Sequence, residues 1–151
     1  MKTYSKTISI KTKNAFEYID ITEKVEQLLK KSKIINGMIV VFSKHTTLAI
    51  RINEKENGFF GDFKEFFSNL LPKSKYYQHN DLKIRTENLV CSPGATDCLN
   101  GHSHCQTMLL NTSETIPVAD GKICLGVWQR VLALELDESR DREILIHIMG
   151  E

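Results

Sequence analysis

The segment richest in potential ligands is Gly101-His102-Ser103-His104-Cys105, near the middle of the 151-residue chain. In an extended strand, His102 and His104 would point to one face, about 6.6 Å apart at the backbone. Both imidazoles could then reach one metal ion, and neutral imidazoles favour zinc, copper, iron or nickel over magnesium. His79 and His45 are available as further ligands. These residues predict a transition-metal site, with surface loop histidines as the alternative interpretation.

Other polar residues could bind a substrate or move protons. The block His45-Thr46-Thr47 abuts an apolar strand, and Asn53-Glu54 stands at the expected start of a long helix, where free amides can bind phosphate. Asp62 lies on the same expected helix, where a solvated face is the alternative role. Arg140 could bind an anion with two hydrogen bonds, although it could equally be a surface arginine. Trp128, followed by Gln129, is the chain's one tryptophan, a residue usually found in a core or an interface.

The remaining histidine and the cysteines give weaker signals. Three cysteines recur at intervals of seven positions, from Cys91 to Cys98 and from Cys98 to Cys105. This spacing does not match the CxxC pairs of zinc ribbons or redox motifs. Structural roles are therefore favoured for these cysteines. His147 lies in an apolar run and is expected to be a hydrogen-bonded strand residue.

The elements that must position these residues follow from apolar periodicity. Strands are predicted at 3–12, 16–21, 38–42, 48–52, 107–110, 115–118, 123–125, 131–136 and 144–149. One helix is predicted after Thr22 as its N-cap, and a second from Glu54 to Leu71, ended by Pro72. The phenylalanines of the second helix recur every three or four residues, which is typical of a core-facing stripe.

The predicted elements combine into an α+β fold with a mostly antiparallel sheet and two main helices. Residues 73–105 show little periodicity and are predicted to form a long loop with one short element at most. The sequence Asp120-Gly121 between two apolar stretches predicts a hairpin turn. The length predicts one domain, residues 1–151.

Composition narrows the classes of function. The chain has 20 Lys+Arg against 19 Asp+Glu, a net charge of +1, which argues against a general nucleic-acid binder. No apolar run approaches the length of a membrane span, and the N-terminal residues lack the apolar core of a signal peptide. The expected location is the cytoplasm, and the expected partner is a small molecule rather than a nucleic acid or a membrane.

Several of these segments resemble the YjbQ family, whose members are often called secondary thiamine-phosphate synthases. The family's HTT and NE block is matched by residues 45–54, its YxH block by 77–81 and its HxH block by 100–105. Its SxxxPVxxGxxxxGTWQ signature is matched from Ser113 to Gln129, with Val127 in place of threonine. Its EFDGPR ending is matched from Glu135 to Arg140, with Glu138-Ser139 in place of Gly-Pro.

The resemblance implies a sandwich-like α+β domain that assembles as a homotrimer. It also implies a pocket lined by the matching residues and weak thiamine-phosphate synthase activity, which joins an aminomethylpyrimidine diphosphate to a thiazole phosphate and expels pyrophosphate. The first hypothesis is a metal-dependent enzyme of this family, and the alternative is a non-catalytic protein that binds a phosphorylated small molecule or a metal.

For the enzyme hypothesis, each candidate residue has an expected role. The metal, a divalent ion of the zinc type rather than magnesium, is expected on His79, His102 and His104. Proton transfer is expected of His45, Glu54 and Asp62. Substrate binding is expected of Thr46, Thr47, Asn53, Trp128, Gln129 and Arg140.

Overall fold

A computed structural model describes residues 1–89 and 99–151. In chain order its elements are β1 (Lys2–Lys11), β2 (Tyr18–Asp20), α1 (Thr22–Ser32), β3 (Gly37–Ser43), β4 (Leu48–Asn53), α2 (Asn57–Leu70), the 3₁₀ turn η1 (Gln78–Asn80), α3 (Gly101–Leu109), β5 (Ser113–Ala119), β6 (Lys122–Ile123), β7 (Arg130–Glu135) and β8 (Asp141–Gly150). No helix in the described part of the chain is long and apolar enough to cross a membrane.

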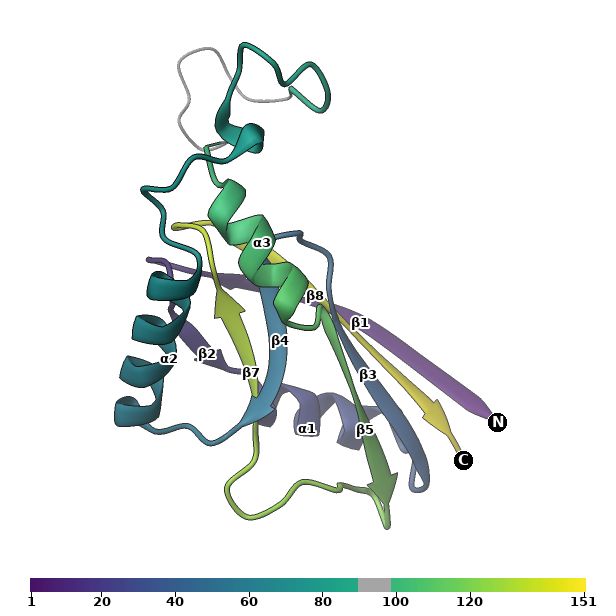
Figure 1. The fold of residues 1–151 in the computed structure, drawn as a ribbon. Coiled ribbons are helices and arrows are strands. Elements are labelled where there is room, and N and C mark those ends of the chain that lie inside the picture. The colour runs from purple at the N-terminus through teal and green to yellow at the C-terminus, as the bar shows by residue number, and fades with distance from the viewer. Residues whose placement is uncertain (90–98) are drawn as a thin grey trace.

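The strands form two antiparallel sheets (Figure 1). The larger has the order β1-β8-β3-β5-β6, and the smaller has the order β2-β7-β4. Strand β8 lies between β1 and β3, and its register with β1 runs from Lys2 opposite Gly150 to Lys11 opposite Asp141. The α+β prediction with mostly antiparallel strands is confirmed.

The main core contains residues of both sheets and of helix α1. Ile39 and Ile146 of the larger sheet belong to the same buried cluster as Ile50 and Ala133 of the smaller sheet. Val25 of α1 joins this cluster, as the i, i+3, i+4 spacing of the helix predicts. The apolar faces of the two sheets and α1 therefore share one core.

Helix α2 packs on the other face of the smaller sheet, beside β2 and β7 (Figure 1). Its Phe63 packs against a small buried cluster that includes Leu134 of β7, and Phe67 is 6% exposed. Strand β7 is consequently buried on both faces, which explains its uninterrupted apolar run. Glu56 caps α2 because its carboxylate accepts the backbone N–H groups of Gly58 and Phe59, both at 2.7 Å.

The hairpin predicted at Asp120-Gly121 joins β5 to β6. Asp120 has φ 51° and Gly121 has φ 69°. Positive φ at both central residues matches a type I′ turn, whose twist suits the two strands that it connects.

Three local predictions are wrong. Residues 101–109 form the helix α3, so the strand predicted at 107–110 and the extended geometry assumed for the Gly101–Cys105 segment do not exist. This third helix falls partly in the predicted long loop. Thr22 does not cap α1; its hydroxyl instead donates to Asp20 at 2.7 Å and accepts the backbone N–H of Val131 at 2.8 Å.

Candidate functional site

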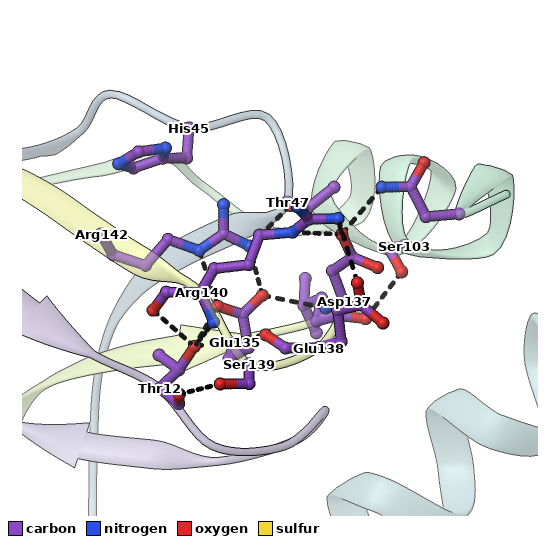
Figure 2. A network of polar contacts seen from close by, with 12 residues as sticks. Thr12, His45, Thr47, Ser103, Glu135, Asp137, Glu138, Ser139, Arg140 and Arg142 are labelled. Carbon is purple, nitrogen blue, oxygen red and sulfur yellow. Dashed lines mark hydrogen bonds and ion pairs between the residues drawn. The ribbon is translucent and has the colours of Figure 1, made fainter. Parts of the chain in front are cut away.

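A buried ion pair lies at one end of the sheets, between Arg142 of β8 and Glu135 of β7 (Figure 2). Arg142 is 4% exposed and Glu135 is 0% exposed. Arg142 Nε donates to Glu135 Oε2 at 2.7 Å, and its Nη2 donates to Glu135 Oε1 and to the Thr47 hydroxyl. Thr12 Oγ1 and the backbone N–H of Asp137 complete the partners of this carboxylate. The pair is thus desolvated and hydrogen-bonded on several sides, as a buried charge requires.

A second ion pair lies beside the first and is less buried. Arg140 Nε and Nη2 contact Asp137 Oδ2 at 2.8 and 2.7 Å. The same carboxylate oxygen accepts the side-chain amide of Asn100 at 2.8 Å. Asn100 directly precedes α3, so this contact ties the start of α3 to the segment that follows β7.

Two histidines meet where η1 approaches the start of α3. The rings of His79 and His104 lie 4.5 Å apart between centroids. Asn80 accepts the backbone N–H of Gly101 at 2.9 Å, which joins the two elements. A Cβ on Gly101 would lie 2.7 Å from the Tyr77 Cβ and 3.1 Å from the His79 Cβ, so this approach requires glycine.

His45 is oriented by the backbone of the neighbouring strand. Its Nε2 accepts the backbone N–H of Glu143 at 2.7 Å. A ring nitrogen that accepts a hydrogen bond carries no proton, so the neutral imidazole of His45 bears its proton on Nδ1. Burial, followed by the nearby charge of Arg142, lowers the pKa of His45. His45 is therefore mostly uncharged at pH 7 and can offer an Nδ1–H donor.

These groups surround one polar pocket of about 340 Å³. Its walls come from the β3–β4 loop, from η1 and the turn after it, from the start of α3, from the connection between β7 and β8, and from the start of β8. The lining residues are His45, Thr46, Thr47, His79, Arg85, Asn100, His104, Asp137, Arg140, Asp141 and Arg142.

Comparison with known proteins assigns the chain to a family. The family model described as "UPF0047 protein YjbQ-like" matches residues 6–151. The chain belongs to the YjbQ family. One YjbQ relative, a UPF0047 protein of Methanothermobacter thermautotrophicus, is 34% identical over 151 residues, which is 100% of this chain and 95% of the relative.

Solved YjbQ structures share the fold. A YbjQ-like protein of unknown function from Sulfolobus solfataricus has a TM-score of 0.86 and 33% identity, over 99% of both chains. An uncharacterized YjbQ/UPF0047 protein of Clostridium acetobutylicum has a TM-score of 0.79 and 31% identity, over 95% of this chain and 98% of that one. The resemblance inferred from the sequence motifs is confirmed.

The YjbQ motifs supply part of the pocket. Six predicted site residues line it: His45, Thr46, Thr47, His79, His104 and Arg140. His102 does not, because residues two apart on a helix point in different directions. Its ring packs 6.2 Å from that of Tyr77, and its buried Nδ1 has no hydrogen-bond partner in the described structure.

The other predicted site residues lie outside this pocket. Glu54 and Asp62 are exposed, and the Asn53 side chain accepts the backbone N–H of Glu54. Trp128 is 72% exposed, and Gln129 accepts the backbone N–H of Gly126. Cys91 and Cys98, for which structural roles were favoured, lie outside the described residues, whereas Cys105 and Cys124 are exposed. His147 contacts Ser5 across the β1–β8 pair, as a hydrogen-bonded strand residue should.

Sequence reasoning did not assign site roles to Arg142, Asn100 and Arg85. For Arg142 a signal was present, since it shares the period-2 face of Ile144 and Ile146 and therefore had to point into the protein. An arginine on a buried face needs a buried anion. Asn100 opens the segment that matches the family's HxH block, which is the signal that could have marked it. No comparable pattern marks Arg85, which is placed by the fold around η1.

Three histidines with lowered pKa values, His45, His102 and His104, should make stability depend on pH. Burial is the main cause that lowers the pKa of His45, His102 and His104 below the ordinary value of about 6.5. Below pH 6.5 the unfolded chain then binds more protons than the folded protein, so the free energy of unfolding falls as the pH is lowered. Each such proton contributes at most about 1.4 kcal/mol per pH unit.

We expect urea denaturation to give a lower free energy of unfolding at pH 5 than at pH 7. A His102→Gln variant removes one of these protons and should show a shallower slope over this interval. Parallel slopes for the variant and the wild type would contradict the prediction, whatever their absolute stabilities.

Proposed function

We propose that the pocket binds the phosphate group of a small molecule and that the protein acts on this ligand with the neighbouring imidazoles. The observation that carries the proposal is the state of Arg142. Its Nε and Nη2 are held by Glu135 and Thr47, whereas its Nη1 has no hydrogen-bond partner among the described residues. Arg142 lines the pocket, so Nη1 offers charge-assisted N–H donors from a guanidinium that cannot rotate away.

The rest of the lining suits the same ligand. Arg85 and Arg140 place two more guanidinium groups on the wall, and His45 adds its Nδ1–H donor. The whole chain carries a net charge of only +1, so no long-range field would concentrate phosphates at the protein. Local donors must supply the affinity, and three arginines at one pocket do so.

His104 supplies the acid–base chemistry in this proposal. Burial, followed by the neighbouring His79, lowers the pKa of His104, which is therefore mostly uncharged at pH 7. A neutral imidazole can accept a proton from a bound ligand or return one to it. His45 is unsuited to this task because the Glu143 N–H occupies its Nε2 lone pair.

The metal prediction has partial support in the donor set. His79 and His104 are close enough for both to reach one ion, but His79 Nε2 also lies 3.2 Å from Asn100 Oδ1 and from Arg85 Nη1. The described residues contain no group of three or more His, Cys, Asp or Glu that could hold a metal. Catalytic zinc commonly has three protein ligands, so the proposed chemistry includes no metal-dependent step.

Thiamine-phosphate synthesis is one reaction that this proposal covers, because both of its substrates carry phosphate groups. Supplying aminomethylpyrimidine diphosphate and thiazole phosphate to the purified protein separates the two hypotheses. Product formation identifies an enzyme of this type. Saturable binding of either compound without product favours the alternative of a binding protein.

Phosphate affinity tests the proposed site directly. An Arg140→Gln variant should bind inorganic phosphate about tenfold more weakly than the wild type, since a hydrogen bond to a charged group contributes about 1.5–3 kcal/mol. Isothermal titration calorimetry at constant ionic strength would measure the Kd. The matched control is Arg51→Gln, because Arg51 pairs with Glu114 and does not line the pocket. Equal affinities in both variants, or no phosphate binding by the wild type, would refute the proposal.

A further inference from the structure

The phosphate pocket adjoins a second cavity of about 530 Å³. Thr46 and His104 line both cavities and therefore mark the boundary at which they meet. The rest of the second cavity comes from the C-terminal half of α3 and from the connection between α3 and β5. His104, Thr107 and Met108 are spaced i, i+3, i+4, which places them on one face of α3.

The two cavities differ in chemistry. The phosphate pocket has three arginines and two aspartates on its walls. The second cavity has none of these residues among the described ones, and its only titratable lining group is the shared His104. Met108 and Leu110 give it an apolar surface, while Asn111 and the neighbouring hydroxyl groups can form hydrogen bonds. It suits an uncharged organic group.

We propose that the ligand of this protein is a phosphate monoester, with its phosphate among the arginines and its uncharged organic group in the cavity lined by Met108 and Asn111. The proposal rests on the proposed function, which places the phosphate. A volume of about 530 Å³ falls within the range of small-molecule sites, whereas inorganic phosphate would leave this cavity unused. The shared position of His104 puts its imidazole beside the bond between the two parts of the ligand.

This arrangement also restricts the class of ligand. A ligand with a second strongly charged group at the far end would have to desolvate that charge against Met108 and Leu110, which is unfavourable. A neutral ring or alcohol would instead displace water from this apolar surface, which is favourable. The second cavity therefore distinguishes phosphate esters by their organic groups, while the first cavity binds the phosphate group that all of them carry.

The test compares inorganic phosphate with phenyl phosphate as probes, using titration calorimetry. The wild type should bind phenyl phosphate at least about tenfold more tightly than inorganic phosphate. Met108→Trp and Asn111→Trp fill the second cavity from two positions that are exposed and should tolerate the change. Both variants should lose most of this preference while their Kd for inorganic phosphate stays within about twofold of the wild-type value.

Leu109→Trp is the matched control, because Leu109 is the next residue on α3, is 60% exposed and lines neither cavity. It should keep the preference for phenyl phosphate. Equal wild-type affinity for the two probes, or an unchanged preference in both cavity variants, would overturn the two-part site and leave the phosphate pocket intact. Failure of the wild type to bind either probe would instead refute the proposed function itself.

Discussion

Replacement of Arg142 by alanine is expected to lower the free energy of unfolding by about 3–5 kcal/mol. The variant would leave the carboxylate of Glu135, which is 0% exposed, without its cation. Thr12 and the backbone N–H of Asp137 would still donate to Glu135, but neither carries a compensating charge. Urea denaturation at pH 7, with equal m-values for both proteins, would measure the loss.

Two further variants test whether burial of the Arg142–Glu135 pair determines how much stability is lost. Arg51→Ala breaks a partly exposed pair with Glu114 and should cost less than about 1 kcal/mol. The double variant Arg142→Met with Glu135→Gln removes both charges and should recover most of the lost stability. A similar loss in Arg142→Ala and Arg51→Ala would show that burial does not determine the cost.

Alanine at Gly101 is expected to cost about 1–3 kcal/mol and to separate His79 from His104. The added Cβ would lie 2.7 Å from the Tyr77 Cβ, closer than carbon atoms normally approach, so η1 would have to move away from α3. His79 is part of η1 and would move with it. We expect a lower free energy of unfolding together with changed NMR signals of the His79 and His104 rings.

Gly61→Ala is the matched control for this substitution. Gly61 lies inside α2, and a Cβ there would meet no atom within 4 Å other than its chain neighbours and the backbone of its own helix. Because alanine is favoured over glycine within a helix, this variant should be more stable than the wild type by up to about 1 kcal/mol. The prediction for Gly101 fails if both variants change stability in the same direction.

Much of the fold was predictable because apolar periodicity is strong where a strand or helix has one buried face. The alternating Ile144, Ile146 and Ile148 predict β8, and the phenylalanines predict α2. Helix α3 was not predicted because its sequence, GHSHCQTML, is only weakly amphipathic. Its buried residues include Ser103, Gln106 and Thr107, whose side chains form specific hydrogen bonds. A pattern of apolar residues does not predict such contacts.

The site was predicted in part for a related reason. The motifs around His45, His79 and His104 are local in sequence, so residue type and family resemblance identified them. The way they converge depends on tertiary contacts, such as the close approach of Gly101 to η1. The helical geometry of α3 also turns His102 away from His104, which the assumption of an extended segment could not predict.

The position of β8 between β1 and β3 has a consequence for folding kinetics. Strand β1 pairs along its whole length with β8, so the two ends of the chain must meet before the larger sheet is complete. Pairings this distant in sequence raise the contact order and are typical of domains that fold in milliseconds to seconds. Arg142 lies on this last strand. During synthesis, β1 and β3 are made before β8, so they cannot pair through it until β8 has been translated. Arg142, the arginine that lines the pocket, is part of β8 and is therefore also translated after these strands.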